Sequence, residues 1–313
     1  MKLQQLRYAL EVYKQNLNVS DAAEVLFTSQ PGISKQIRLL EEEIGVPIFV
    51  RQGKRLVSVT EPGEMVLSIA ERILRDSQNI QKIGQDFAKK DTGKLNIAAT
   101  PLWGKYHFPK IVQNFIQSFP EVKLSLQTGS LDYIYFLLEN SQADLGIIAG
   151  NAILDSECHS MPFDSLKYQL IIRKNHPLKD KQLIDLQDLI NYPILCEKCL
   201  CQNTNNFQNK FAEMALDTPD IIMTTDETDM IFSLVKQKYG IGIVSQFVLP
   251  NDDDFIVKDL SHLFADIPLS LILKNNQYLH GYALHFIEQI SHRFNAPLLQ
   301  KLLYQPITED YSI

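Results

Sequence analysis

Residues 18–43 contain two short helical patterns separated by a tight break, and this stretch restricts the fold of the chain more than any other. The first pattern places small and apolar residues on one face: Val19, Ala22, Ala23 and Leu26. The second starts close to Ser29, and its apolar residues recur at steps of four, three and four: Ile33, Ile37, Leu40 and Ile44. Two amphipathic helices so close together predict a helix-turn-helix, in which the second helix enters the major groove of duplex DNA.

Polar and basic side chains occupy the opposite face of the second helix. Gln30, Ser34 and Arg38 recur at every fourth position, with Lys35 beside them, and such side chains can reach base edges and phosphates. The glutamates at 41–43 would be repelled by phosphates. We therefore expect the N-terminal half of this helix to enter the groove and its C-terminal end to point away from the duplex.

A short basic hairpin is predicted directly after the two helices. Residues 48–51 and 54–59 form its strands around a turn at Gln52 and Gly53, with basic side chains at the tip. A helix pair in an unrelated all-α core is the alternative interpretation, and the hairpin favours the helix-turn-helix. We predict that duplex DNA is contacted by the following residues: Ser29, Gln30, Pro31, Ser34, Lys35, Arg38, Arg51, Lys54 and Arg55.

Composition separates this segment from the rest of the chain. The 313 residues are 45% hydrophobic and 21% charged, which suits a globular protein of two or three domains. The net charge is −7, but residues 1–90 carry 13 Lys and Arg against 11 Asp and Glu, so a local basic surface can still bind phosphates. The apolar runs are too short for a membrane span or a secretory signal, so we expect a cytoplasmic protein with no membrane partner.

A long helical pattern follows the hairpin and predicts self-association. Its apolar positions recur at steps of three and four, with one polar interruption: Val66, Ile69, Ile73, Asp76, Ile80, Ile83 and Phe87. A helix with such a seam needs a partner helix, most simply in a homodimer, although a helix buried against its own domain is the alternative. Two copies would also match the two half-sites that dimeric helix-turn-helix proteins normally read.

Short apolar strands alternate with helices after a linker at residues 89–93. Strands are predicted at 94–98, 123–128, 145–148, 169–173, 221–224, 241–244 and 269–273. Helices are predicted at 106–118, 131–140, 204–215, 228–238 and 280–294. The alternation predicts a mostly parallel sheet covered by helices, which binds ligands at the carboxyl ends of its strands.

The motifs of the N-terminal segment resemble those of the LysR-type transcriptional regulators. The similarity rests on Ala22-Ala23, Ser29-Gln30-Pro31, Ser34-Lys35-Gln36-Ile37, Leu40-Glu41, Gly45, Phe49-Val50-Arg51 and Thr60-Glu61-Pro62-Gly63. Residues 1–8, 16–19 and 28–36 are similar more narrowly to the CysB-like subgroup, which controls sulfur assimilation. The length and the layout of the chain agree with this resemblance from end to end.

The resemblance implies an α/β chain with an N-terminal all-α winged helix-turn-helix, a long linker helix and an effector domain. That domain would consist of two Rossmann-like α/β subdomains, similar to periplasmic solute-binding proteins. We place the DNA-binding domain at residues 1–60, the linker and dimerisation helix at 61–92 and the effector-binding domain at 93–313. Subdomain I would comprise 93–162 and 267–313, and subdomain II 163–266.

By the same resemblance, the chain is a sequence-specific transcriptional regulator and not an enzyme. It would bind promoter DNA as a homodimer or homotetramer, respond to a small-molecule effector, possess no cofactor and have RNA polymerase as a candidate partner. The resemblance also suggests a role in sulfur or cysteine metabolism. A solute-binding module and an oxidoreductase that uses the Cys-x-x-Cys of residues 196–199 are the less favoured alternatives.

The expected effector pocket departs from the subgroup pattern. In CysB-like proteins the first strand leads into Thr-Thr-x-Thr-Gln, which binds sulfate or an acylated serine, whereas only Thr100 matches here. Threonines expected at 149 and 202 are Ala149 and Gln202, so we predict a weak response to those ligands. The predicted effector contacts are Thr100, Leu102, Trp103, Thr128, Gly129, Ser130, Ala149, Gln202, Thr204 and Thr225.

The cysteines allow a different signal. Cys196, Cys199 and Cys201 lie within six residues, which would suit a thiolate metal site or a thiol sensor. A structural zinc site usually has two separated ligand pairs, so we predict no metal and favour incidental cysteines, with thiol or metal sensing as the alternative.

Overall fold

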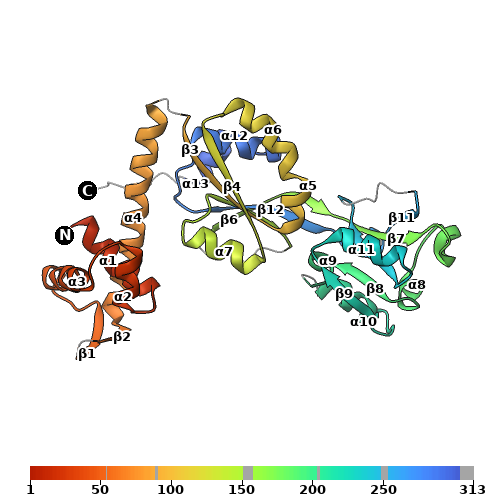
Figure 1. Cartoon of the computed structure of the whole chain (residues 1–313), viewed down its shortest axis with the longest axis horizontal. Helices are drawn as coiled ribbons and strands as arrows, with labels where there is room; N and C mark the ends of the chain where they lie inside the picture. Colours follow the sequence, from red (N-terminus) through yellow and green to blue (C-terminus); the bar gives the residue numbers. More distant parts are fainter. Residues whose placement is uncertain (54, 89–90, 151–157, 203–204, 248–252, 304–313) are drawn as a thin grey trace, which may run out of the picture. The chain divides into compact units, whose positions relative to one another are not determined.

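The computed structural model describes residues 1–53, 55–88, 91–150, 158–202, 205–247 and 253–303 (Figure 1). The chain forms two compact units. The first is Met1–Lys90 together with Asn276–His280, and the second is Asp91–Asn275 together with Gly281–Ile313. The chain therefore passes from one unit to the other three times.

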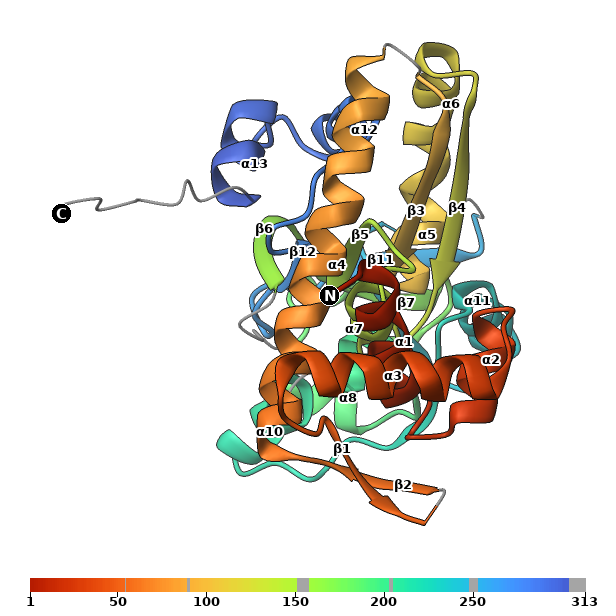
Figure 2. The same cartoon turned by 90° about the vertical axis from the view of Figure 1, so that its left-hand side faces the viewer.

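The first unit contains the predicted helix pair and the predicted hairpin. Its elements are α1 (Leu3–Lys14), α2 (Val19–Val25), α3 (Gln30–Ile44), β1 (Phe49–Gln52), β2 (Arg55–Val59) and α4 (Glu61–Phe87). Strands β1 and β2 pair antiparallel. Figure 2 shows α3 running across the front of this unit, with the β1–β2 hairpin projecting below it.

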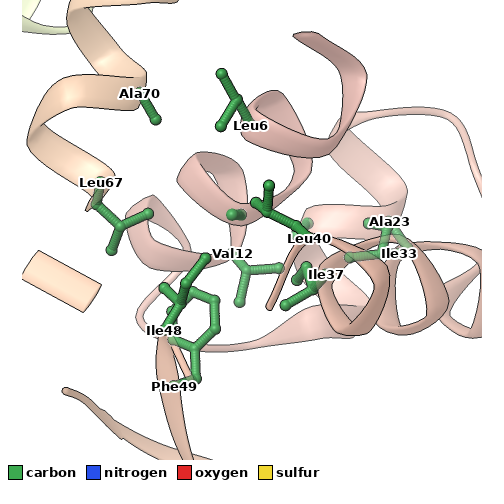
Figure 3. Close-up of a cluster of buried hydrophobic side chains, with 12 residues drawn as sticks. Leu6, Val12, Ala23, Ile33, Ile37, Leu40, Ile48, Phe49, Leu67 and Ala70 are labelled. Carbon is green, nitrogen blue, oxygen red and sulfur yellow. The ribbon is translucent and has the colours of Figure 1, made fainter. Parts of the chain in front are cut away.

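One apolar core joins these elements (Figure 3). The predicted stripe of α3 supplies Ile33, Ile37 and Leu40, and the small residues Ala22 and Ala23 of α2 are buried beside it, which allows the two helices to approach closely. The remaining core residues are Leu6, Ala9 and Val12 of α1, Ile48, Phe49, and Leu67 and Ala70 of α4. The first half of α4 is thus part of the same core as the helix-turn-helix.

Side chains and a glycine set the ends of α2 and α3. Asn18 Oδ1 accepts hydrogen bonds from the N–H groups of Ser20 and Asp21, at 3.0 and 3.4 Å, at the start of α2. Ser29 Oγ accepts one from the N–H of Gly32 at 3.3 Å, at the start of α3. Gly45 ends α3 in the left-handed conformation, with φ of 80°, which glycine adopts without strain.

Helix α4 leaves much of its predicted seam exposed in the single chain. Ile80 is 70% exposed and Phe87 is 82% exposed, and Ile69 is also exposed. The interrupting Asp76 is exposed as well. This 27-residue helix therefore has exposed apolar residues that a second helix could cover, and the pairing itself stays a prediction.

A tether segment, Asn276–His280, docks on the second half of α4 within the first unit. Asn79 is buried, donates from Nδ2 to the Asn276 carbonyl at 2.7 Å and accepts at Oδ1 from the N–H of Tyr278 at 3.0 Å. Asp86 accepts from the Tyr278 hydroxyl at 2.7 Å, and its other oxygen lies 2.9 Å from His280 Nδ1. Residues almost 200 positions apart are thereby held together.

The second unit alternates strands and helices. Its first part has β3 (Gly93–Ala99), α5 (Pro101–Tyr106), α6 (Phe108–Ser118), β4 (Val122–Thr128), α7 (Leu131–Glu139), β5 (Leu145–Ala149), β6 (Cys158–Leu166), β7 (Tyr168–Arg173), the 3₁₀ helix η1 (Pro177–Asp180) and α8 (Leu186–Ile190). Then follow β8 (Ile194–Glu197), α9 (Lys198–Gln202), α10 (Asn205–Glu213), β9 (Ile221–Thr225), α11 (Thr228–Lys236), β10 (Ile241–Ser245), β11 (Phe255–Asp259), β12 (Ile267–Lys274), α12 (Gly281–Ile290) and α13 (Ala296–Leu303).

These strands form two five-stranded sheets, in the orders β4-β3-β5-β12-β6 and β11-β7-β10-β8-β9. The expectation of a mostly parallel sheet is wrong, because both sheets are mixed. In the first, β3 is parallel to β4 and β5, whereas β12 is antiparallel to β5 and β6. In the second, β8 is parallel to β9 and β10, whereas β7 is antiparallel to β10 and β11. Parallel pairing needs a crossover, which the helices supply only around β3 and β8.

Helices cover both faces of each sheet. In the first sheet α7 packs on Ala98, Ile148 and Ile272, and α6 and α12 lie on the opposite face (Figure 1). In the second sheet, α11 packs on Ile171 and Leu195. Tyr168 points to the opposite face of β7 from Ile171 and stacks there with Phe207 of α10. None of the described helices combines the length and the apolar composition needed to cross a membrane.

Candidate functional site

The first candidate site is the exposed face of α3. Gln30, Pro31, Lys35 and Arg38 are exposed, and Ser34 is half-buried. Because the buried stripe of α3 fixes the rotation of the helix, the polar side chains predicted to contact DNA are displayed together on its other face. The capping residue Ser29 is also exposed, at the N-terminal end of this face.

The hairpin is fastened to the end of α3 by Glu41. One carboxylate oxygen of Glu41 accepts hydrogen bonds from the N–H groups of Ile48 and Phe49, at 3.0 and 3.2 Å, and the other lies 3.0 Å from Nη2 of Arg51. The glutamates at 41–43 are expected to be repelled by phosphates. Glu41 in addition orients the base of the hairpin and pairs with one of the predicted phosphate contacts.

A hollow of about 500 Å³ lies between the hairpin and the helices. Gln30 and Arg55, both predicted to contact DNA, line it together with Leu56, Val57 and residues 16–20 before and within α2. Thus the structure brings Arg55 and the start of α3 to one surface. Lys54, also predicted as a phosphate contact, lies outside the described residues.

The second candidate site is a cavity of about 310 Å³ where strands of both sheets end. The first sheet contributes Thr100 after β3, Gly129 and Ser130 after β4, and Ala149 at the end of β5. The second sheet contributes Lys198 and Cys199 after β8 and Asp226 after β9, while Pro101, Leu102, Leu131 and Asp132 complete the lining. Carboxyl ends of parallel strands are where α/β sheets bind ligands, and the cavity is at the small end of the size range for such sites.

Backbone contacts hold the first-sheet loops around this cavity. The N–H of Thr100 donates to the Ile147 carbonyl at 2.9 Å, and that of Gly129 donates to the Ala99 carbonyl at 3.1 Å. A Cβ atom at position 129 would overlap the ring of Tyr133, so a residue larger than glycine would displace that ring. Thr100 is only 8% exposed, and its hydroxyl has no hydrogen-bond partner among the described residues.

Charges of both signs surround the cavity. Lys198 is exposed at the start of α9, opposed by the carboxylates of Asp132 and Asp226. Burial, with further contributions from Glu197 and Asp226, raises the pKa of the Cys199 thiol well above its ordinary value. Cys199 is therefore protonated at neutral pH, the opposite of the activated thiolate that the oxidoreductase alternative requires.

An ion-pair cluster joins the two parts of the second unit. Lys105 of α5 lies 2.9 Å from Asp229 and 3.3 Å from Glu227, at the beginning of α11. The hydrogen bond to Asp229 is the largest of the contributions that raise the pKa of Lys105. All three side chains are partly exposed, so the cluster is screened by solvent.

Deeper in the second sheet, Glu197 is a buried carboxylate, 2% exposed. It accepts hydrogen bonds from the Thr228 hydroxyl and from the N–H of Ser245, both at 2.8 Å. Burial raises its pKa, and these hydrogen bonds oppose the shift. Glu197 thus ties the end of β8 to α11 and β10.

The cysteine cluster contains a disulfide between Cys196 and Cys201, whose Cα atoms lie 6.4 Å apart. The sequence did not predict this pairing, which forms because β8 leads directly into α9 and the turn brings the two side chains together. Cys199, which lies between them in the sequence, is not part of this disulfide. Among the described residues, no group of three or more His, Cys, Asp or Glu side chains is arranged to hold a metal ion.

Half of the predicted effector contacts line the cavity: Thr100, Leu102, Gly129, Ser130 and Ala149. Trp103 does not, because it is buried and stacks on His107, and the methyl group of Thr128 faces Gly104. Thr225 ends β9 without lining the cavity, and Thr204 and the side chain of Gln202 lie outside the described residues. These assignments stay predictions.

Asp132, Lys198 and Asp226 line the cavity but are not among the predicted effector contacts, although Thr225, directly before Asp226, is one of them. Asp132 lies in the first turn of α7, directly after the predicted Ser130. Asp226 follows β9, and a polar residue just after a strand was the signal available for it. Lys198 lies between Cys196 and Cys199, where the sequence pattern indicated only a site made of thiols.

Comparison with known proteins covers both units. The family described as bacterial regulatory helix-turn-helix protein, lysR family, matches residues 3–64, and the family described as LysR substrate binding domain matches residues 88–295. The HTH-type transcriptional regulator SsuR of Burkholderia cenocepacia is 33% identical over 309 residues, 98% of this chain and 100% of that protein. The HTH-type transcriptional regulator CysB of the same organism is 35% identical over 306 residues, 97% of each chain.

Solved structures agree with these sequence matches. The crystal structure of the cofactor-binding domain of the Cbl transcriptional regulator has a TM-score of 0.62 and 26% sequence identity to this chain. The similarity covers 68% of this chain and 94% of that one.

Proposed function

The chain belongs to the LysR family of bacterial transcriptional regulators, and on that premise we propose that it binds specific promoter DNA and responds to a small molecule in the cavity of its second unit. One observation carries the DNA-binding part: the buried stripe of α3 displays Gln30, Ser34 and Arg38 on its free face, beside a hairpin with Arg51 and Arg55. The action is binding alone, with no chemical step.

We divide the chain for this function as residues 1–60 for DNA, 61–92 for the linker and dimerisation helix, and 93–313 for the effector. Sheet membership supports a subdivision of the last part, since β3 to β6 and β12 share one sheet while β7 to β11 share the other. The exposed seam of α4 supports assembly of two or more copies. The similarity to CysB supports a role in sulfur or cysteine metabolism.

A gel-shift titration on the DNA upstream of the chain's own gene tests the proposal. Binding through several phosphates makes the logarithm of affinity fall linearly with the logarithm of salt concentration. We expect Arg51→Ala to weaken binding to all sequences, and Gln30→Ala and Ser34→Ala to change which sites are preferred. Arg293→Ala, which removes an exposed arginine of the second unit, is the charge-matched control.

Two results would contradict this assignment. Wild-type protein that binds the upstream fragment no better than unrelated DNA would refute sequence-specific regulation. Equal, sequence-independent losses for all three variants would refute the division between phosphate contacts and base contacts.

A thiol-responsive signal is the second candidate, favoured by the Cys196–Cys201 disulfide. The bond connects the end of β8 to α9, and α9 supplies Lys198 and Cys199 to the cavity. Reduction by a dithiol would release α9 from this restraint. If the signal is a thiol, dithiothreitol changes the promoter affinity of wild-type protein and leaves that of Cys196→Ser unchanged, whereas equal responses would exclude it.

A further inference from the structure

The turn between α2 and α3 holds an aromatic side chain in a conformation that favours glycine. Helix α2 ends in a Schellman motif, in which the N–H of Phe27 donates to the Glu24 carbonyl at 3.2 Å and that of Thr28 donates to the Ala23 carbonyl at 2.9 Å. Phe27 occupies the left-handed position of this motif, with φ of 49°. A side chain with a Cβ atom is strained there, and glycine is the usual residue.

Phe27 also gains nothing from burial, because it is 98% exposed. The strained backbone is unfavourable to the folded chain, and a ring that stays in water gives no burial energy to offset that strain. The apolar contact that often accompanies a Schellman motif does not explain the ring, since that contact is made by the following residue, here Thr28. The residue is therefore unexplained by the stability of the first unit.

The position of Phe27 relates it to the proposed DNA-reading surface. It precedes the helix cap Ser29 by two residues, and Ser29, Gln30 and Pro31 are all exposed. In helix-turn-helix proteins the N-terminal residues of the second helix contact base edges in the major groove. The ring consequently lies at the end of α3 that would enter the groove.

The floor of the major groove offers a distinctive apolar group, the C5-methyl of thymine, which phenylalanine can contact. Resting on the proposed function, we propose that Phe27 is a specificity-determining residue that packs against the C5-methyl group of a thymine next to the bases read by α3. The strained turn orients the ring outward for this contact. The ring thereby favours sites with thymine at one position, without a hydrogen bond.

The Phe27→Gly variant separates this role from folding, because glycine removes the ring and relieves the strain. We expect a melting temperature equal to or above that of the wild type. The DNA probe is the fragment upstream of the chain's own gene, prepared with either thymidine or deoxyuridine, which lacks the methyl group. Wild-type protein should bind the deoxyuridine fragment about fivefold more weakly, as expected for the loss of a buried methyl contact.

The losses of DNA affinity caused by Phe27→Gly and by the deoxyuridine substitution should not add. Phe27→Gly should lose a similar factor on the thymidine fragment and nothing further on the deoxyuridine fragment. Ala215→Gly is the matched control, because Ala215 also has a positive φ, of 54°, and the same pair of turn hydrogen bonds, from Ala215 to Ala212 and from Leu216 to Phe211. This variant should bind both fragments as the wild type does.

Several results would overturn the inference while leaving the proposed function intact. They are wild-type affinity for Phe27→Gly, a deoxyuridine penalty that persists in Phe27→Gly, and no deoxyuridine penalty in the wild type. A change in oligomeric state with unchanged DNA affinity would instead assign the ring to a protein contact and also overturn it. Absence of any specific binding by the wild type would refute the proposed function itself.

Discussion

Glu197 is the side chain whose protonation should leave the clearest mark on stability. Because burial raises its pKa, the folded chain holds this proton to higher pH than the unfolded chain does. Its contribution is most favourable below the unfolded pKa of about 4.3 and is lost as the pH rises through the raised folded value.

We therefore expect the free energy of unfolding of the wild type to fall, relative to that of Glu197→Gln, as the pH is raised from 4 to 8. Urea denaturation at several pH values measures this difference. Glu213→Gln, an exposed glutamate of α10, is the control and should show a pH dependence parallel to that of the wild type. Parallel curves for Glu197→Gln would show that the carboxyl titrates normally.

The charges around the cavity predict weak binding of anions such as sulfate. A sulfate ion near Lys198 would also face Asp132 and Asp226, and like charges oppose its binding. We expect calorimetry to detect no tight sulfate binding by the wild type, and Asp226→Asn to raise sulfate affinity on the order of fivefold, equivalent to about 1 kcal/mol.

Asp253→Asn serves as the control, because Asp253 is exposed and does not line the cavity. Tight binding of sulfate or of an acylated serine to the wild type would contradict the charge argument. Such a result would mean that the hydroxyl of Thr100 and the loop amides outweigh the two carboxylates.

Among the secondary-structure elements, α4 carries the clearest expectation for assembly. Ile80 lies on the predicted seam and is 70% exposed, so Ile80→Glu removes no contact from the core of the single chain. Placing a carboxylate there should oppose helix pairing and shift the oligomer toward the monomer. Light scattering coupled to size-exclusion chromatography measures this shift.

The neighbouring Gln81 is exposed and off the seam, so Gln81→Glu adds the same charge without touching the predicted interface. This control should keep the wild-type oligomer. If Ile80→Glu also keeps it, α4 does not pair through this face.

The elements also show what sequence reasoning could reach. Helix α3 was predictable because its apolar residues follow the helical period and Ser29 and Gly45 mark its ends. Strand β6 was missed because its sequence, which includes Pro162 and Asp164, lacks a clear alternation, and its long antiparallel pairing with β12 stabilises it.

The candidate cavity was only half predictable for a related reason. Thr100 and Ser130 follow strands of one sheet, so the strand-end rule locates them. The same rule locates the end of β9 at Asp226, but no local pattern shows that this end and Lys198, both from the other sheet, face Thr100 and Ser130. The pairing of Cys196 with Cys201 likewise depends on the turn into α9, because three nearby cysteines allow more than one pairing.

For the whole molecule, the tether segment Asn276–His280 should be sensitive to α4. Asn79→Ala removes two hydrogen bonds from a buried position, at a cost of about 1–3 kcal/mol. We expect faster amide hydrogen exchange in residues 276–280, measured by mass spectrometry. Gln78→Ala, at an exposed position of the same helix, should leave exchange unchanged, and equal exchange in both variants would show that Asn79 does not hold the segment.

The tether segment also determines what happens when the chain is cleaved or shortened between α4 and β3. The peptide that docks on α4 is encoded more than 180 residues after α4 ends, between β12 and α12. A protease cut between α4 and β3 would therefore yield two polypeptides that stay associated without a peptide bond, because the larger piece keeps five residues bound to the helix of the smaller one. A fragment beginning at Gly93 would lack Asn79 and Asp86, so residues 276–280 would lose the hydrogen bonds that hold them.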